Sequence, residues 1–367
     1  MPFLDLRPVN DGLKAQILAD LSDLIDANTF INGTQVSEFE ASFAHYCGTH
    51  LCVGVASGLD AIRFALISAG IEAEDEVILP ANTFVATLEA VTQAGGVPIL
   101  ADVSEEDYNI DVAAAEAAIT PRTRVLLPVH LYGHMADMRA LASLAARHRL
   151  ELVEDACQAH GAERDGLRAG AVGRAGAFSF YPGKNLGAMG DAGALVTDDE
   201  ELASRARALR EHGQSAKYRH DVEGYTARLD TIQALVLLHK LPLLDSWNEE
   251  RRAAAQAYSE QLMGVGDLTL PPMPADRASV WHLYVVRTSD PDRLSAFLAE
   301  RRIGTGRHYP EPAHLAPAYS WLGYRRGAFP IAEELCDHAL SLPMFAGISE
   351  EQLQVVVEAI SDFFRGG

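Results

Sequence analysis

The chain has 367 residues, of which 48% are hydrophobic, 7% aromatic and 22% charged, a balance typical of globular proteins and not of disordered or fibrous ones. This length exceeds what one hydrophobic core usually serves, so we expect a large domain and a smaller one. The formal charge is −21, from 30 basic and 51 acidic residues, which excludes general binding to nucleic acid or to an anionic membrane surface. Any anionic ligand therefore needs a local cluster of donors.

The cysteines and the first residues indicate the compartment. Cys47, Cys52, Cys157 and Cys336 form no C-x-x-C pair, which favours free thiols in a reducing environment. The opening MPFLDLRPVN lacks the basic segment and apolar core of a signal peptide. No run of about 18 uninterrupted apolar residues could span a membrane. We therefore expect a soluble, cytoplasmic protein.

Short apolar runs alternate with helical segments between residue 51 and about residue 200. The runs cover residues 52–57, 76–80, 97–103, 124–131, 150–156, 177–181 and 193–197. The helical segments 58–70 and 137–148 carry apolar residues on one face. Strands that are apolar on both faces, alternating with amphipathic helices, predict an α/β fold with a largely parallel sheet covered on both sides. The last run follows a glycine-rich loop and can pair antiparallel.

The second half of the chain changes character. Residues 201–262 predict helices that are interrupted by a loop at 212–225. A strand at 281–288, a helix at 290–303 and a final helix from about Glu350 predict a small α+β domain. We expect an N-terminal segment that packs near the small domain, a large domain that binds the cofactor, and the small C-terminal domain, over residues 1–45, 46–250 and 251–367.

Lysine is scarce, with only Lys14, Lys184, Lys217 and Lys240 among 30 basic residues. Lys14 and Lys240 lie in helical stretches, where we expect solvated side chains. Lys184 lies in SFYPGKNLGAMGDAG, whose glycines allow the backbone to approach a bound group closely. A lysine that loses hydration there can act as a neutral amine and form a Schiff base. A lysine on a mobile surface hairpin is the alternative interpretation.

Two other positions indicate the same chemistry. Asp155 ends the apolar run LELVEDA, and the ends of parallel strands are where open sheets present ligand-binding residues. A carboxylate there can pair with a protonated pyridine nitrogen, as pyridoxal phosphate requires. Ser57 and Asp60 match the S-x-x-D capping pattern at the start of a helix, whose free N–H groups can bind phosphate. Each signal alone also fits a turn carboxylate or a simple cap.

Together these motifs resemble the DegT/StrS family of nucleotide-sugar aminotransferases, which are fold-type I enzymes with pyridoxal 5'-phosphate (PLP). The resemblance covers nearly the whole chain, because the following segments occur in family order: NGTQVSEFEASFAHYCGT, VASGLDAIRFAL, DEVILPANTFVAT, PVHLYG, VEDACQAHGA, AFSFYPGKNLGAMGDAGA, RLDTIQA and HYPEP. Some members have a histidine in place of the lysine and act as dehydratases. The lysine present here implies transamination.

The resemblance also implies roles for individual residues. Lys184 matches the Schiff-base lysine, which then moves the proton during transamination, and Asp155 matches the partner of the pyridine nitrogen. Gln158 matches the residue that approaches the phenolic oxygen of PLP, and Phe84 matches the aromatic side chain stacked on its ring. The phosphate cradle corresponds to Ser57, Gly58 and Ser179. No metal is implied.

A segment around residue 226 resembles the family loop that crosses a homodimer to the partner's phosphate site. The family usually has Asn in G-x-N-x-R-L, whereas this chain has Thr226, whose hydroxyl can donate one hydrogen bond. The loop 212–228 also holds a local basic cluster, which we interpret as the counter-charge for a pyrophosphate. The cluster consists of Lys217, Arg219, His220 and Arg228.

Substrate preference follows from QAHGA, FSFYPGKN, KYRH and HYPEPAHL, which most resemble members that aminate C3 of a dTDP-3-keto-6-deoxyhexose. We expect contacts with the sugar or pyrophosphate from Tyr181, His308 and Tyr309, and a catalytic role for His160, for which a buried supporting histidine is the alternative. The amino donor implied by the family is L-glutamate, and the product is a dTDP-3-amino-3,6-dideoxyhexose. The C4 configuration and the nucleotide base stay open.

Three other functions are compatible with parts of the pattern. A dTDP-4-keto-6-deoxyhexose 4-aminotransferase would use the same residues. A PLP-binding regulatory protein without turnover is disfavoured by the acidic charge and by the lack of a preceding DNA-binding segment. A dinucleotide-dependent dehydrogenase is excluded because no G-x-G-x-x-G follows the first strand.

Overall fold

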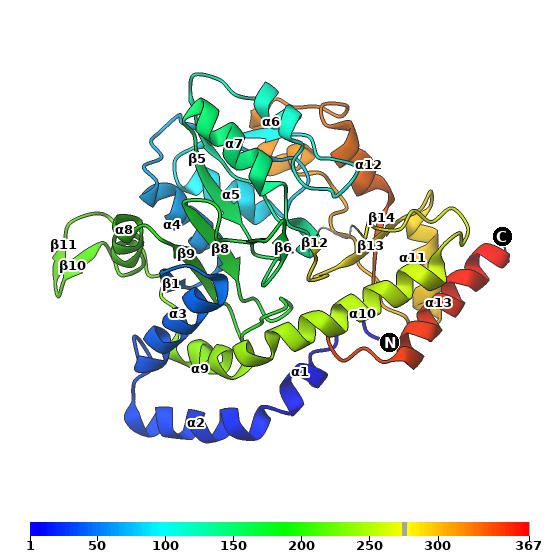
Figure 1. Ribbon diagram of the computed structural model, residues 1–367, viewed down its shortest axis with the longest axis horizontal. Coiled ribbons are helices and arrows are strands. Elements are labelled where there is room, and N and C mark those ends of the chain that lie inside the picture. Colours follow the sequence, from blue (N-terminus) through cyan, green and yellow to red (C-terminus); the bar gives the residue numbers. More distant parts are fainter. Residues whose placement is uncertain (274–276, 367) are drawn as a thin grey trace.

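The computed structural model describes residues 1–273 and 277–366, which are built around a central sheet with helices on both sides (Figure 1). In this part of the chain the sheet has seven strands in the order β1-β9-β8-β5-β4-β2-β3. They are β1 (Leu51–Val55), β2 (Glu76–Pro80), β3 (Val97–Ala101), β4 (Thr123–Leu126), β5 (Glu151–Asp155), β8 (Ala175–Ser179) and β9 (Gly193–Thr197). Pairing is parallel from β8 to β3, whereas β9 runs antiparallel to β1 and β8. The predicted α/β fold is confirmed.

Alternate residues of the strands pack into two separate hydrophobic cores. On β2, Val77 and Leu79 pack into one core and Ile78 into the other, because successive side chains of a strand point to opposite faces. Ile62 of α4 lies in the first core and Leu141 of α7 in the second. The helices of this part of the chain are α3 (Thr34–Cys47), α4 (Gly58–Ser68), α5 (Val85–Gln93), α6 (Val112–Ala117), α7 (Met138–His148), α8 (Glu200–Arg210) and α9 (Thr231–Lys240).

The C-terminal part forms a smaller core at the other end of the long helix α10 (Leu244–Leu262) (Figure 1). Tyr258 of α10 packs there with Leu298 and Val356. The elements of this part are β13 (Tyr284–Arg287), α11 (Pro291–Glu300), α12 (Pro330–His338), β14 (Ala339–Leu342) and α13 (Glu350–Arg365). The expected boundary at 250/251 falls inside α10, which continues through both parts, so this division stays a prediction.

The N-terminal residues make contacts with both parts. The carbonyl of Met1 accepts a hydrogen bond from Gly304 N at 2.9 Å, in the C-terminal part. Leu24 and its neighbours on α2 (Lys14–Ala27), which follows the short α1 (Arg7–Asp11), pack against Leu235 of α9. Helix α3 lies against β1 and α9. Of residues 1–45, the beginning therefore contacts the small part and the remainder the large part.

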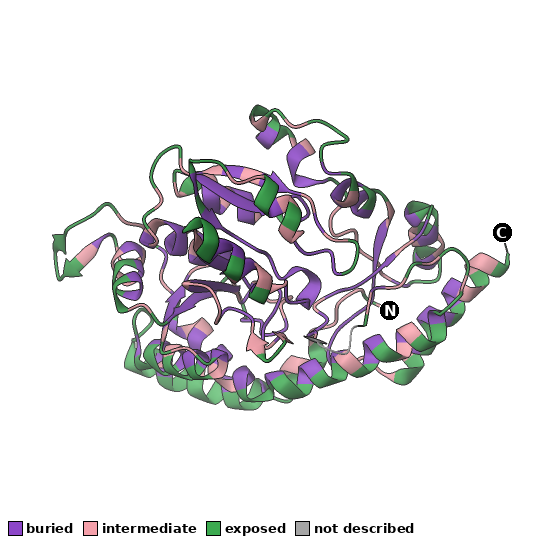
Figure 2. Cartoon of the chain, turned by 45° about the horizontal axis from the view of Figure 1, so that its top comes forward, coloured by how far each residue is buried: buried purple, intermediate pink, exposed green. Residues whose placement is uncertain are grey.

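The outer elements complete the fold. The hairpin β10 (Gln214–Ala216) and β11 (Arg219–His220) projects from the sheet end that carries α8, at the left of Figure 1. The short strands β6 (Glu163–Arg164), β7 (Leu167–Arg168) and β12 (Arg277–Ala278) form a separate sheet. Short 3-10 helices cover Leu131–Gly133, Leu241–Leu243, Ala313–Leu315 and Pro317–Leu322. Figure 2 shows buried residues concentrated in the sheet and exposed ones along the outer helices. In residues 1–273 and 277–366, no helix has the length and apolar character needed to cross a membrane.

Candidate active site

A cavity of about 570 Å³ lies where β5 and β8 end and α4 begins. The small part contributes a second wall to it, with Leu283, His308, Tyr309 and Met344. Many predicted site residues line this cavity: Ser57, Gly58, Phe84, Asp155, Gln158, Ser179, Tyr181, Lys184, His308 and Tyr309. Parallel strand ends converge here, as the position of Asp155 in the sequence predicted.

The start of α4 approaches β8 very closely. Ser57 caps the helix, because its Oγ accepts a hydrogen bond from Asp60 N at 3.1 Å. A Cβ added to Gly58 would lie 2.6 Å from the Cβ of Ser179 and 2.7 Å from Cys157 Sγ, so only glycine fits. The first N–H groups of α4 therefore face the cavity beside the Ser179 hydroxyl, an arrangement suited to a phosphate. The predicted cap at Ser57 is confirmed.

The Asp155 carboxylate is buried and held by two donors. Thr87 Oγ1 donates to Oδ2 at 2.8 Å, and the backbone N–H of Cys157 donates to Oδ1 at 3.1 Å. The hydroxyl of Thr83 lies 2.8 Å from that of Thr87, so it supports the same group. Sequence analysis missed both threonines, which lie four residues apart, Thr83 just before α5 and Thr87 in its first turn. The carboxylate is thus fixed at the edge of the cavity.

Lys184 is positioned by a tight loop between β8 and β9. Its backbone N–H donates to the carbonyl of Tyr181 at 2.8 Å, and a Cβ on Gly187 would lie 2.3 Å from the carbonyl oxygen of Pro182. Burial lowers the pKa of Lys184, and this effect outweighs the opposing influence of Cys157 and Asp155. Among the described residues, none accepts a hydrogen bond from Lys184 Nζ. The amine is therefore available to react, as a Schiff-base lysine requires.

The prediction that Lys240 is solvated is wrong. The side chain is 3% exposed, and its Nζ donates to the carbonyl of Gly187 at 2.8 Å. Burial lowers its pKa to about 8. The reason is that α9 packs beneath the glycine-rich loop, so Lys240 supports the loop that carries Lys184.

Gln158 has one possible orientation. Its Oε1 accepts the backbone N–H of Tyr132 at 2.8 Å, which directs Nε2 towards the hydroxyl of Tyr309 at 3.1 Å. The ring of Phe84, which is 51% exposed, lies 5.5 Å from the ring of Tyr309. The amide donor of Gln158 and the aromatic face of Phe84 therefore both border the cavity, from segments that are distant in the sequence.

His160 lies behind the cavity wall. Its Nε2–H donates to the carbonyl of Ser179 at 2.9 Å, and the residue is not part of the cavity lining. Burial lowers the pKa of His160 to about 3, so the ring is neutral. This position does not agree with the expected catalytic role of His160. It fits the alternative, a histidine that supports the cavity wall.

The predicted basic cluster does not reach the cavity of its own chain. Lys217, Arg219 and His220 are exposed on the projecting hairpin. Thr226 Oγ1 lies 3.1 Å from a ring nitrogen of His212. Arg228 forms an ion pair with Glu211 at 2.8 Å. Within one chain, none of these residues lines the site.

Several lining residues were given no role by the sequence analysis. They are Phe3, Leu4, Glu89, Cys157, Asp191 and His282. His282 is the most informative of them, because a nearby hydrogen-bond chain fixes its tautomer. Its partner Asn185, and Asn248 to which Asn185 donates, are far away in sequence, so no local pattern could have indicated it.

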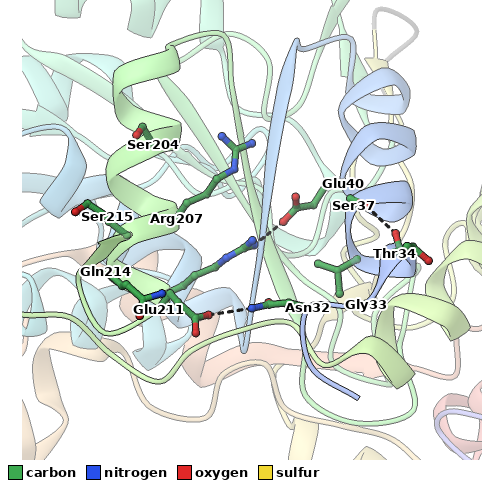
Figure 3. A pocket seen from close by; sticks show the side chains of 13 residues that line it. Asn32, Gly33, Thr34, Ser37, Glu40, Ser204, Arg207, Glu211, Gln214 and Ser215 are labelled. Atoms are coloured by element: carbon green, nitrogen blue, oxygen red, sulfur yellow. Dashed lines mark hydrogen bonds and ion pairs between the residues drawn. The ribbon is translucent and has the colours of Figure 1, made fainter. Parts of the chain in front are cut away.

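A second cavity, of about 520 Å³, lies between the start of α3 and the end of α8 (Figure 3). Arg210 pairs there with Glu40, and Asn32 Nδ2 donates to Glu211 Oε2 at 3.3 Å. Several of the polar groups in view therefore bind one another. This cavity lies away from Lys184 and Asp155, so the first cavity is the candidate active site.

An α/β sheet with a partly buried lysine and a strand-end aspartate facing one cavity defines the class of fold-type I PLP-dependent enzymes. A family model described as the DegT/DnrJ/EryC1/StrS aminotransferase family matches residues 11–361, and the chain belongs to this family. PLP is the cofactor of the family. The buried lysine amine, the fixed carboxylate and the glycine-framed helix start fit that cofactor.

Individual relatives are similar over their full length. The dTDP-3-amino-3,4,6-trideoxy-alpha-D-glucose transaminase of Streptomyces venezuelae is 46% identical over 363 residues, covering 99% of this chain and 96% of the relative. A pleiotropic regulatory protein of Geobacillus stearothermophilus is 45% identical over 367 residues, covering 100% and 99%. The solved structure of S. venezuelae DesV in complex with a ketimine intermediate has a TM-score of 0.96 at 46% identity, covering 99% and 98%.

Proposed function

We propose that the protein is a PLP-dependent aminotransferase that converts a dTDP-3-keto-6-deoxyhexose to the dTDP-3-amino-3,6-dideoxyhexose, with L-glutamate as amino donor. The observation that carries this proposal is that Lys184, Asp155 and Gln158 line one cavity. The similarity to a transaminase named for a dTDP-3-amino sugar supports the choice of substrate class and of C3. The free cysteines are in keeping with a reducing cytoplasm, where we place the enzyme.

The cofactor would be held at five points of the cavity. Lys184 would bind it covalently through Nζ, and Asp155 would pair with its ring nitrogen. Gln158 Nε2 would donate to its phenolic oxygen, and Phe84 would cover one face of its ring. Its phosphate would lie at the start of α4, against Ser57, Gly58 and Ser179. When bound, PLP supplies an electron sink for the substrate carbon that loses its proton.

The protein's own residues carry out the proton transfer. Burial lowers the pKa of Lys184, which favours the neutral amine, so Nζ can take a proton once the amino donor has displaced it. Lys184 Nζ can then donate this proton to another atom of the bound substrate and cofactor. Thr87 and the Cys157 N–H hold the Asp155 carboxylate in place throughout, so its charge does not have to reorient.

The test is an assay of the purified holoenzyme with L-glutamate and either dTDP-3-keto- or dTDP-4-keto-6-deoxyhexose. NMR of the product then locates the amino group. Amination at C3 supports the proposal, and amination at C4 favours the 4-aminotransferase, which needs no change to the residues above. Conversion of neither sugar would contradict both.

A regulatory protein is the second candidate, favoured by the similarity to the Geobacillus protein. The two functions differ in one simple measurement. An aminotransferase converts its bound cofactor to the amino form with L-glutamate, which changes the absorbance spectrum. A protein that only senses the cofactor would bind PLP without this conversion.

We further propose a homodimer in which the segment 212–228 contributes to the partner's site. Arg228→Ala and Lys184→Ala should each be nearly inactive, whereas mixing them should restore activity. Random exchange of equal amounts gives half heterodimers, each with one intact site of two, so about a quarter of the sites should work. Glu211→Gln is the control, since it removes the same ion pair as Arg228→Ala and should stay active. Subunit exchange without recovery would contradict a shared site.

A further inference from the structure

His282 lines the active-site cavity from the small part of the chain, opposite the strand ends of the sheet. Its backbone is held by Arg251, which is buried and donates through Nη1 to the carbonyls of Trp281 at 3.1 Å and His282 at 3.4 Å. The ring is therefore attached to a rigid position and not to a mobile loop.

A chain of side-chain amides fixes the tautomer of this histidine. Asn248 Nδ2 donates to the carbonyl of His160 at 2.8 Å, which leaves Asn248 Oδ1 to accept from Asn185 Nδ2 at 2.9 Å. Asn185 Nδ2 also donates to the carbonyl of Val280 at 2.7 Å. Since carbonyl oxygens only accept, neither amide can be turned over.

The fixed amide orientations determine which nitrogen of the His282 ring carries the proton. Asn185 Oδ1 faces His282 Nδ1 at 3.2 Å and can only accept, so Nδ1 must carry the proton. Burial lowers the pKa of His282 well below its usual value, and the ring is neutral. In a neutral ring with a proton on Nδ1, Nε2 is a hydrogen-bond acceptor.

Nothing in the described part of the chain uses this acceptor. Nε2 has no hydrogen-bond partner there, and it is not among the side-chain atoms that are buried without a partner, so it is open to the cavity. The other histidine in the lining differs. His308 Nδ1 meets the hydroxyl of Ser341 at 2.8 Å, and a hydroxyl can donate or accept, so the tautomer of His308 is not fixed.

We propose that His282 binds substrate, accepting at Nε2 a hydrogen bond from a ring hydroxyl of the keto sugar, an inference that rests on the proposed aminotransferase function. None of the proposed cofactor contacts involves His282, which enters the cavity from the small part of the chain, so its open nitrogen is available to the substrate. A neutral acceptor favours hydroxyl groups and disfavours the carboxylates of glutamate.

Two substitutions test the roles of His282 Nδ1 and Nε2 separately. His282→Asn retains a donor for Asn185 and removes the acceptor from the cavity. His282→Gln places an amide oxygen near the position of Nε2 and loses the Nδ1 donor. For His282→Asn we expect a decrease of about 10- to 100-fold in kcat/KM with the keto sugar, and a glutamate half-reaction at the wild-type rate. His282→Gln should recover part of the loss.

The measurement uses the holoenzyme and follows each half-reaction by the absorbance of the cofactor. Binding of a nucleotide-linked hexose without the keto group, measured by calorimetry, should weaken by a similar factor in His282→Asn. Sugar analogues that each lack one ring hydroxyl identify the partner, because for one of them wild type and His282→Asn should become equal.

Other outcomes would overturn the inference. Equal losses in both half-reactions would mean that His282 only supports the fold, and a loss confined to glutamate would mean that it binds the donor. A difference between wild type and His282→Asn that persists with every analogue would also contradict it. If the wild type responds to glutamate but aminates no keto sugar, the proposed function fails first and the inference with it.

Discussion

Glu154, the neighbour of Asp155 on β5, offers a sharp test of how the site is supported. Its side chain is fully buried and accepts four hydrogen bonds. Oε2 accepts from His130 Nε2 at 2.8 Å and from Gly170 N at 2.9 Å. Oε1 accepts from Val172 N and Gly173 N, each at 2.7 Å.

The expected cost of Glu154→Gln follows from these contacts. An amide has one oxygen, so whichever way it turns, two buried donors lose their acceptor. His130 cannot compensate by changing tautomer, because its Nδ1 already accepts from Ala136 N at 3.2 Å. A hydrogen bond to a charged group contributes about 1.5–3 kcal/mol, so the loss should be about 3–6 kcal/mol of unfolding free energy.

Glu151→Gln is the matched control, because it makes the same change on the same strand. Glu151 is 43% exposed and pairs with Arg174 at 3.3 Å, and such surface pairs contribute about 0–1 kcal/mol. Urea unfolding of the cofactor-free variants, followed by circular dichroism, measures both values. If the two variants lost the same stability within about 1 kcal/mol, the four hydrogen bonds would not act as described.

Three further predictions concern the cavity. Borohydride treatment of the holoenzyme should attach the cofactor to the peptide that contains Lys184, and attachment to Lys217 or Lys240 would contradict the assignment. Asp155→Asn should still bind PLP while transamination decreases by orders of magnitude, and near-normal turnover would make the carboxylate purely structural. His160 takes up its proton at about pH 3 when folded but near pH 6.5 when unfolded, so stability should fall as pH decreases, by about 2 kcal/mol between pH 6.5 and 5. His160→Gln keeps a donor for Ser179 and should show a weaker pH dependence of its unfolding free energy, whereas an unchanged dependence would refute this origin.

The sequence alone was sufficient to predict those structural features that depend on neighbouring residues in the chain. The strands at 76–80 and 193–197 have the bounds that their apolar runs predicted, because both faces of each strand are buried. The cap at Ser57 was predictable for the same reason, since donor and acceptor are three residues apart. The position of Asp155 in the site was predicted from the rule that ligand-binding residues lie at the ends of parallel strands. This rule requires a parallel sheet, but it does not require the order of the strands to be known.

Residues whose environment comes from distant segments were predicted poorly. Lys240 looked solvated because its partner, the Gly187 carbonyl, lies 53 residues earlier. The resemblance implied a catalytic role for His160, with a supporting histidine as the alternative, but the fold turns its ring to the back of Ser179. His282 carried no motif, and its meaning depends on two asparagines from other elements. Side-chain direction and tautomer are tertiary properties, which periodicity and spacing do not encode.

The charges around the cavity bear on the proposed dimer. The lining contains three carboxylates, from Glu89, Asp155 and Asp191, but Lys184 is the one lysine or arginine among the lining residues of the described chain. A cofactor phosphate and a substrate pyrophosphate would add further negative charge, and the start of α4 offers only partial compensation. Meanwhile Lys217 and Arg219 extend into solvent on a hairpin that contributes nothing to the cavity of its own chain. A second subunit that brings this hairpin to the cavity would supply the missing positive charge, and it would explain why so acidic a chain keeps a basic segment exposed.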